Sequence, residues 1–326
     1  MKVWRLAKVL LTGLLAGVAS AVAALAPPQA FRTVDGAYVT EVGGDLTDPY
    51  FVNKAFIIAL EADAALREEV VGWLAWLLPR QRRDGGFDRF CGARSGHWVA
   101  CLEADADDSM AATTIHLIEL VRRKGWLDPA QDARARRAGR RAAALLRTLR
   151  DPGDGLYHAF AHAPAQYLMD NLEVHAALRI SGQRAAADAL LQAIRRHFHT
   201  AAGWRPSRPD LPTEAFYPHA LARTFLWRSG IMGPAEAAAD EAAWLAQYSR
   251  TWLGRDSDRY AWGLVAWDIH ELAPLEAACW RASVRIDPAA VGWTVLDAQV
   301  DAALRQRGIP AACPRLNLQG QVPAPG

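Results

Sequence analysis

The sequence lacks several features that mark common classes of protein. Runs of β-branched residues are scarce, while Ala, Leu and Arg dominate, so we expect the chain to be helical almost throughout. No glycine-rich phosphate loop and no Gly-x-Ser-x-Gly elbow occur, which removes the usual signatures of nucleotide binding and of serine hydrolases. No CxxC pair is present and no histidine is suitably spaced beside a cysteine, so neither a zinc site nor another cofactor is predicted.

The chain also has little net charge. Its 326 residues carry a formal net charge of +2, and no basic patch is interleaved with aromatic residues, so nucleic acid is not expected as a partner. The arginine-rich segment 133–150 predicts an amphipathic helix with a solvated basic face, and a nucleic-acid surface there is the alternative. The hydrophobic share of 52% supports one large domain or two small ones.

Both ends of the sequence differ in composition from the rest. Three basic residues precede an uninterrupted apolar run at 9–26, which is the order of parts in an export signal. The run is also long enough to remain as a membrane anchor, which would then be the only contact with a membrane. We therefore assign 1–30 to a signal peptide or anchor and expect the remainder in the periplasm or outside the cell. The Pro- and Gly-rich segment 310–326 predicts a tail.

Four cysteines are present, an even number that suits an oxidising compartment. Cys91 and Cys101 bracket a short loop, and a disulfide that closes this loop leaves Cys279 and Cys313 as the second pair. Four cysteines allow three pairings, and the short loop favours this one.

Six segments share one design, in which polar, acidic or aromatic residues lead into a helix that is apolar on nearly every side. A helix of that kind is buried on every side. Between these segments lie helices with one charged face, which are expected to contact solvent, for example at 66–83, 133–150, 183–198 and 234–253. The alternation predicts an all-α fold, an (α/α)6 toroid at 31–309 with inner and outer rings of helices. The buried helices are expected to begin near residues 48, 107, 166, 214, 260 and 293.

Acidic residues crowd the start of one buried segment. In "EADADDS", residues 103–109, four acids precede an apolar helical pattern: Glu103, Asp105, Asp107 and Asp108. Helix capping and the helix dipole explain one or two of these acids, but like charges so close repel each other. In a toroid the N-terminal ends of all six inner helices open onto one face around a central funnel. Acids and aromatic residues from distant parts of the sequence would meet there.

Carboxylates together with aromatic rings suit a carbohydrate, because sugar C–H faces stack on rings while sugar hydroxyls hydrogen-bond to carboxylates. Hydrolysis of a glycosidic bond needs two carboxyl groups, one protonated as the acid and one ionised as base or nucleophile. The predicted catalytic residues are Asp107 or Asp108 together with Asp170. The predicted substrate-binding residues, of which Asp48 and Glu214 are also alternative catalytic groups, are Asp45, Asp48, Tyr50, Asp105, Asn171, Glu173, Glu214, Tyr217, Tyr260 and Trp262.

Residues 35–306 resemble the six-hairpin glycosidases and their (α/α)6 relatives in the repeat, the signal segment and the acidic helix starts. The segment "DADDSMAATTIHL" (105–117) is similar to the paired-aspartate motif of bacterial endo-α-mannanases. That similarity implies nucleophile and acid/base roles for Asp107 and Asp108.

A second motif resembles another family of the same group. The segment "YLMDNLEVHAAL" (167–178) looks like the Asp-Asn motif of unsaturated glucuronyl hydrolases, whose aspartate is the general acid/base. This resemblance implies the same role for Asp170, with Asn171 beside it. Those enzymes also use a second aspartate from an earlier inner helix, for which Asp107 or Asp108 is the counterpart.

Two other classes of protein remain open. The segment "WLLPRQRRDGGF" (76–87) resembles the Gln-Trp repeat of triterpene and diterpene cyclases, and "DADD" (105–108) matches their DxDD motif. That resemblance implies that Asp107 protonates an alkene. The other class is a non-catalytic toroid that binds polysaccharide or scaffolds an envelope complex. His158 and His162 have a spacing that suits a metal ion, but their loop position without a third ligand favours plain hydrogen bonding.

Overall fold

The protein is mainly α-helical, as the sequence predicted, in a computed structural model that describes residues 29–63, 66–211, 215–256, 260–284 and 292–314. Within these ranges the chain forms eleven α-helices and a few strands of two to four residues. Most of the predicted signal segment, most of the predicted tail and Glu214 lie outside the described residues. None of the helices in the described ranges combines the length and the apolar character needed to cross a membrane.

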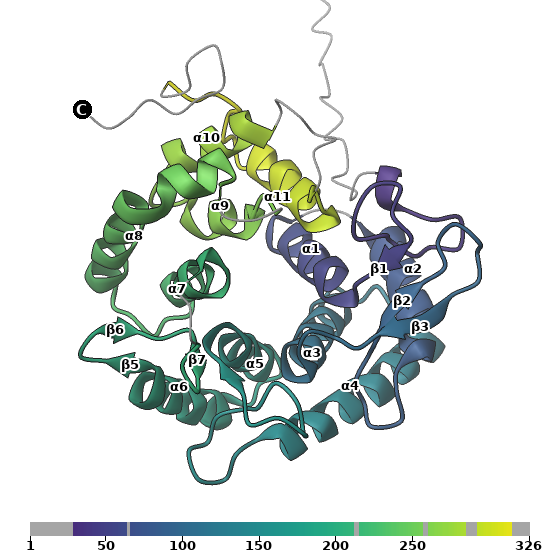
Figure 1. The fold of residues 1–326 in the computed structure, drawn as a ribbon. Coiled ribbons are helices and arrows are strands. Elements are labelled where there is room, and N and C mark those ends of the chain that lie inside the picture. The colour runs from purple at the N-terminus through teal and green to yellow at the C-terminus, as the bar shows by residue number, and fades with distance from the viewer. Residues whose placement is uncertain (1–28, 64–65, 212–214, 257–259, 285–291, 315–326) are drawn as a thin grey trace, which may run out of the picture.

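Six helices surround a common centre, and each contacts two others of the set (Figure 1). Neighbours in chain order contact each other, and the last of the six contacts the first. We call these the inner helices: α1 (Pro49–Glu61), α3 (Asp107–Arg123), α5 (Leu168–Ile180), α7 (Leu221–Trp227), α9 (Gly263–Ile269) and α11 (Val295–Gln306).

Five further helices lie outside this set, and each contacts at least one inner helix (Figure 1). Their sequences are amphipathic. In the arginine-rich outer helix at Pro129–Leu149, for example, Ala135 and Ala138 are buried while Arg134 and Arg137 are exposed. This is the amphipathic pattern that the sequence predicted for 133–150. The outer helices are α2 (Arg67–Leu77), α4 (Pro129–Leu149), α6 (Arg184–Phe198), α8 (Pro234–Gly254) and α10 (Pro274–Val284).

Four inner helices begin within two residues of the predicted position, but α7 and α9 begin later. A short π-helix (Phe216–Ala220) precedes α7, and Tyr217 within it is extended, with φ −97° and ψ 126°. Pro218 explains this conformation, because a residue that precedes proline is disfavoured from the helical region. Trp262, which precedes α9, is left-handed with φ 49°. Both departures place an aromatic residue at the start of an inner helix.

Short strands, which the sequence did not predict, brace the loops before the inner helices. The first sheet is antiparallel and has β2 between its two neighbours, with Cys91 opposite Val99. It consists of β1 (Leu46–Thr47), β2 (Arg89–Cys91) and β3 (Val99–Leu102). Two further pairs are β4 (Gln166–Tyr167) with β7 (Ser207–Arg208), and β5 (His199–Thr200) with β6 (Gly203–Trp204). Single 3₁₀ turns occur at Gln29–Phe31 and Leu78–Arg80.

The predicted disulfide between Cys91 and Cys101 is confirmed, and the other two cysteines form a second disulfide. Cys91 and Cys101, whose Cα atoms are 5.8 Å apart, join β2 to β3 directly before α3. Cys279 of α10 pairs with Cys313. Two disulfides in one chain are typical of proteins that fold in an oxidising compartment.

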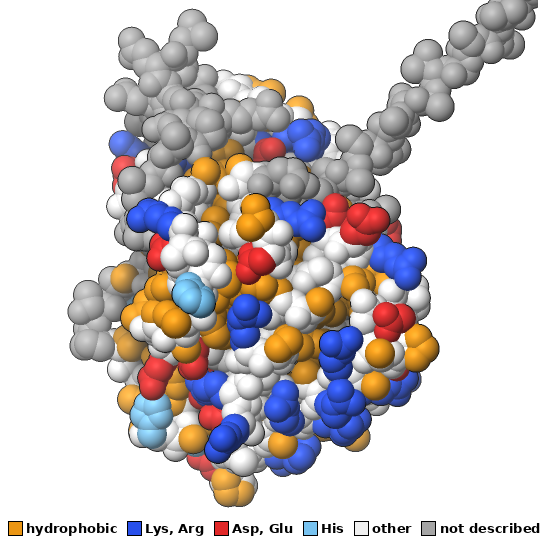
Figure 2. Space-filling model, turned by 90° about the vertical axis from the view of Figure 1, so that its right-hand side faces the viewer, with side chains coloured by type: hydrophobic (Ala, Val, Ile, Leu, Met, Phe, Trp, Pro, Cys, Tyr) orange, Lys and Arg blue, Asp and Glu red, His pale blue; other side chains and the backbone are white. Residues whose placement is uncertain are grey.

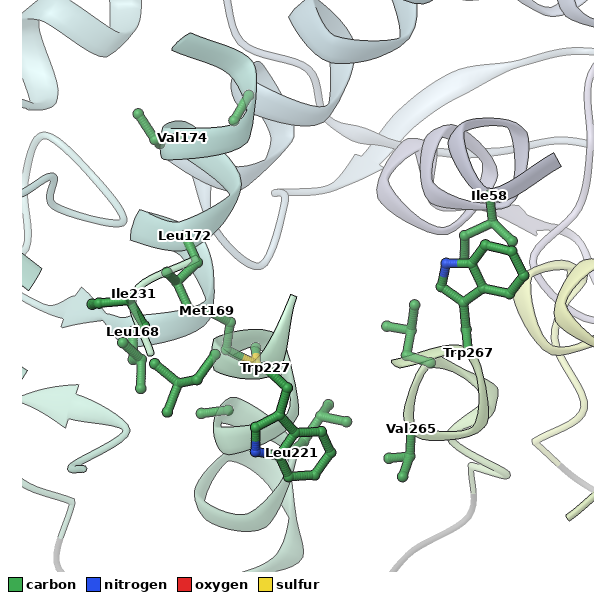
Figure 3. Close-up of a cluster of buried hydrophobic side chains, with 14 of the residues drawn as sticks. Ile58, Leu168, Met169, Leu172, Val174, Leu221, Trp227, Ile231, Val265 and Trp267 are labelled. Atoms are coloured by element: carbon green, nitrogen blue, oxygen red, sulfur yellow. The ribbon is translucent and has the colours of Figure 1, made fainter. Parts of the chain in front are cut away.

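The buried core lies within and between the helices. Figure 3 shows part of it, where Leu172 of α5, Trp227 of α7 and Val265 of α9 belong to one cluster of buried side chains. Residues 55–60 of α1, predicted to be buried, are buried throughout. Each large apolar side chain that is removed from water in this way contributes about 1.5–3 kcal/mol to folding.

Candidate active site

Acidic residues stand at the starts of three consecutive inner helices. Asp48 caps α1, where its carboxylate accepts a hydrogen bond of 3.0 Å from the backbone N–H two residues on. Asp107 and Asp108 occupy the first turn of α3, and Asp170 lies in the first turn of α5. Electrostatic interactions link Asp108 to Asp170 and Asp48 to Asp105, so the three helix starts lie at the same end of the inner set.

The carboxyl groups of Asp108 and Asp170 form a buried pair. Asp108 is fully buried and Asp170 is 5% exposed. Asp108 Oδ1 accepts the backbone N–H of Ser109 at 2.8 Å, while the buried Oδ2 has no hydrogen-bond partner in the described part of the chain. The charge of Asp170 acts on Asp108, so the two carboxyl groups lie close together, and a proton on one of them can be shared with the other.

Burial raises the pKa of both carboxyl groups, and nearby negative charges raise both further. The pKa of Asp108 lies well above its usual value because of burial first and the charge of Asp170 second. Burial and then the charge of Glu173 raise the pKa of Asp170, while Asp108 opposes the rise. Because the pKa of Asp170 is raised to about 8 and that of Asp108 lies well above its usual value, both carboxyl groups are protonated at neutral pH.

Glu173 lies one turn beyond Asp170 on the same face of α5 and is held by two residues of α1. Its Oε1 accepts a hydrogen bond of 2.9 Å from the Tyr50 hydroxyl and pairs with Lys54 Nζ at 3.0 Å. Burial raises the pKa of Glu173, and both contacts oppose that rise. Lys54 was not predicted as a site residue; its signal in the sequence was a single cation inside an otherwise apolar segment.

Asp107, adjacent to Asp108, has a different environment. Its Oδ1 lies 2.6 Å from Arg82 Nη2, and Arg82 also pairs with Asp84 at 3.2 Å and with Asp88 at 2.9 Å. Burial raises the pKa of Asp107, and Arg82 opposes the rise. Asp107 therefore belongs to an ion-pair cluster with the 82–88 loop, while Asp108 contacts Asp170.

Asp48 is a further buried acid, at the start of α1. It is 4% exposed, and Arg89 Nε lies 3.8 Å from its Oδ2. Burial raises the pKa of Asp48 to about 6, with Arg89 lowering it and Asp105 raising it. Arg89 also binds Asp105, which is itself exposed.

Aromatic rings form a continuous row across the starts of α7, α9 and α1. Tyr217 stacks on Trp262, with ring centroids 5.2 Å apart and planes 12° apart. Trp262 contacts Tyr260 at 5.4 Å, and Tyr260 contacts Phe51 at 5.8 Å. Tyr217 is 46% exposed, and the charge of Asp170 contributes to the raised pKa of its hydroxyl. The stacked pair of Tyr217 and Trp262 is therefore an open aromatic surface near the carboxyl pair.

Two other predicted binding residues already have backbone partners. The Asn171 side chain accepts from the backbone N–H of Tyr157 at 2.8 Å and donates to the carbonyls of Tyr157 and Tyr167. Asp45 accepts the backbone N–H of Arg94 at 2.8 Å. Both side chains thus fix loops at the rim of the site.

At the opposite end of the inner set, a cavity of about 510 Å³ is lined by α1, α3, α5, α7 and α9. Lys54 and Glu173 lie on its wall, so this ion pair stands between the cavity and the carboxyl pair. Asp268 also lines the cavity and accepts from Thr224 at 3.0 Å; burial raises its pKa to about 6.

The arrangement supplies a protonated carboxyl pair, a separate buried carboxylate and an aromatic surface at one end of the helix set. Among the described residues, no group of His, Cys, Asp and Glu side chains is arranged to hold a metal ion. No protein-family model matches the chain, and no curated protein matches it. The geometry therefore carries the functional argument alone.

Proposed function

We propose that the chain is an exported glycoside hydrolase with an (α/α)6 toroid, in which the pair Asp108–Asp170 supplies the catalytic proton. The cyclic contacts among the six inner helices and the five outer helices support the toroid. The two disulfides support export. The observation that carries the proposal is the pair of buried carboxyl groups, Asp108 and Asp170, in the first turns of two inner helices that contact each other.

The two members of the pair have different tasks. Asp170 is the member with an exposed fraction, so it delivers the proton to the glycosidic oxygen. Asp108 is fully buried and cannot touch a substrate; it positions Asp170 and returns a proton to it. The paired carboxyl groups of retaining glycosidases are about 5–5.5 Å apart, and those of inverting enzymes about 6.5–9.5 Å. The pair acts as one proton donor and a further carboxylate serves as base, so the separation of that carboxylate from Asp170 decides between the two outcomes.

Asp48 is the candidate for that base. It lies at the start of the neighbouring inner helix, and its pKa of about 6 makes it ionised at neutral pH while the pair remains protonated. Environments that separate the pKa values of acidic groups are how one site obtains both an acid and a base. The surface of Tyr217 and Trp262 would support the apolar face of a sugar ring.

The test is hydrolysis of a panel of polysaccharides and oligosaccharides by the wild type and by Asp170→Asn, Asp108→Asn and Asp48→Asn. General acid catalysis contributes about 10²–10⁴-fold, so we expect a loss of kcat of that order in Asp170→Asn with the fold retained. Asp107→Asn is the matched comparison, because it removes the adjacent acid from the Arg82 cluster and leaves the pair intact. We expect it to lower stability more than turnover.

Two outcomes of these assays would favour the alternative classes, a non-catalytic binding protein or a terpene cyclase. Sugar binding without hydrolysis by the wild type, weakened by Tyr217→Ala, would make the protein a non-catalytic toroid. Loss of activity on an isoprenoid substrate in Asp107→Asn, with no sugar bound, would make it a cyclase. Against the second outcome, the Asp107 carboxylate is paired with Arg82, which opposes its protonation.

A further inference from the structure

A groove on the outer surface is lined by residues that have no role in the proposed function. It runs between α2 and α4 and encloses about 690 Å³. That volume lies within the range of about 300–1,000 Å³ found for small-molecule sites. We call it the α2–α4 groove.

The floor of the α2–α4 groove is aliphatic. Leu74 and Leu78 come from the α2 side, Leu127 from the turn before α4, and Ala135 and Ala138 from α4 itself. Among the described residues, no aromatic side chain lines the groove. Sugars and nucleic-acid bases are held by stacking on rings, so this floor suits neither. An aliphatic chain matches it, because apolar burial needs no directional partner.

The rim of the groove is cationic. Arg134, Arg137, Arg140 and Arg141 line it, and no acidic side chain from the described part of the chain does. None of these four forms an ion pair with an acid in the described part of the chain, whereas Arg136 on the same helix pairs with Asp132. Figure 2, which views the side of the molecule on which α2 lies, shows Lys and Arg side chains gathered in the lower part of this face among hydrophobic ones.

The size and charge of the groove also limit its occupant. A helix about 10 Å across fills about 420 Å³ per turn, so the groove takes in only about one and a half turns of a partner helix. The chain's own segments 1–28 and 315–326 contain no acidic residue that would match the arginines. Four arginines over an aliphatic floor instead match one molecule with a hydrocarbon chain and an anionic head.

We propose that the α2–α4 groove binds a long-chain carboxylate, with its hydrocarbon chain along the aliphatic floor and its carboxylate on the arginines of α4. Guanidinium groups bind carboxylates through paired N–H donors, which fixes the head, while burial of the chain supplies most of the affinity. The proposal is independent of the glycosidase proposal, since the groove shares no residue with the carboxyl pair.

Isothermal titration calorimetry of the purified protein tests the proposal with laurate below its micellar concentration. Butyrate has the same head without the chain, and dodecyltrimethylammonium has the chain with a cationic head. We expect laurate to bind in a 1:1 ratio and each of the other two to bind at least about tenfold more weakly. Butyrate lacks most of the buried hydrocarbon, and dodecyltrimethylammonium cannot accept the charge-assisted hydrogen bonds of the arginines.

Paired variants locate the site. Arg137→Gln/Arg141→Gln removes two groove arginines, and Arg136→Gln/Arg147→Gln removes the same charge from α4 outside the groove. Ala75→Trp fills the groove from an exposed position, and Ala133→Trp adds the same side chain at an exposed position outside it. We expect only the first member of each pair to weaken laurate binding by about tenfold or more.

Three results would overturn the proposal. The first is that laurate does not bind, and the second is that dodecyltrimethylammonium binds equally well, which would leave only a non-specific apolar surface. The third is that both members of each variant pair behave alike, which would place the bound laurate elsewhere. If an acidic amphipathic peptide bound in the groove and laurate did not, the groove would be a protein-docking site instead.

Discussion

The hydroxyl of Tyr50 donates a hydrogen bond of 2.9 Å to Glu173, a residue 123 positions later in the sequence. Lys54, one turn along the same helix as Tyr50, pairs with the same oxygen of Glu173 at 3.0 Å. Two helices from distant parts of the chain are thus joined at the centre of the fold, directly beneath the carboxyl pair. The first prediction concerns this junction.

Lys54→Met should destabilise the protein strongly, because it leaves Glu173 buried without its cation. Breaking a buried ion pair from one side costs about 3–5 kcal/mol. The double variant Lys54→Met/Glu173→Gln should recover much of that loss, since no uncompensated charge remains. Urea denaturation at neutral pH measures the free energy of unfolding of both. A loss below about 1 kcal/mol in Lys54→Met would mean that the pair contributes little.

Asp48→Asn should be more stable than the wild type at pH 7 and equal to it near pH 3. The pKa of Asp48 rises from 3.8 to about 6 on folding, so the folded protein binds more protons than the unfolded chain between these values. Stability is therefore lost as pH rises through this window, by about 3 kcal/mol at 1.36 kcal/mol per pKa unit. Asparagine still caps α1.

Thermal unfolding from pH 3 to pH 8 measures this difference. Asp132→Asn is a comparison of opposite sign, because the hydrogen bonds from Arg136 and Arg122 lower the pKa of Asp132. The stability that Asp132 contributes is present above its unfolded pKa and is lost as pH falls. If the stability differences of Asp48→Asn and Asp132→Asn from the wild type changed in the same direction with pH, the raised pKa of Asp48 would be contradicted.

Cys91→Ser/Cys101→Ser should loosen the hairpin of β2 and β3 and the loop that leads to Asp105. A disulfide that closes a loop of this size contributes about 2–4 kcal/mol, and we expect the melting temperature to fall accordingly. Hydrogen exchange should increase at 89–105 and not in α10. Cys279→Ser/Cys313→Ser should show the reverse pattern. Free thiols at Cys91 and Cys101 in mass spectrometry of the unreduced protein would refute the disulfide.

Tyr217→Ala should raise KM for an oligosaccharide by about tenfold with a smaller effect on kcat, because stacking holds the substrate without touching the reacting atoms. Tyr217→Phe keeps the ring and should behave like the wild type. An equal loss in both variants would instead assign the role of Tyr217 to its hydroxyl. This prediction rests on the proposed glycosidase activity, and a substrate from the panel above is needed to measure it.

The sequence predicted helix content, most inner helix starts and the disulfide between Cys91 and Cys101, because these depend on local patterns, whereas Cys279 and Cys313 were only the pair left over. It did not distinguish Asp107 from Asp108. Adjacent helical residues point about 100° apart, and only the packed structure shows that one contacts Arg82 and the other Asp170. The extended Tyr217 also had a local signal, the proline after it, but its stacking on Trp262 is a contact between two different helices.

The contact between α1 and α11 has a consequence for how the protein is made. Arg307, just beyond α11, donates a hydrogen bond of 2.9 Å to the carbonyl of Glu61, 246 positions earlier. During synthesis, the face of α1 that contacts α11 stays uncovered until α11 has been made. Contacts that span so much of the chain slow folding and leave apolar surface open to aggregation in the meantime. A nascent chain that stops before residue 295 would lack this closing helix, so we expect such truncations to depend on chaperones rather than fold alone.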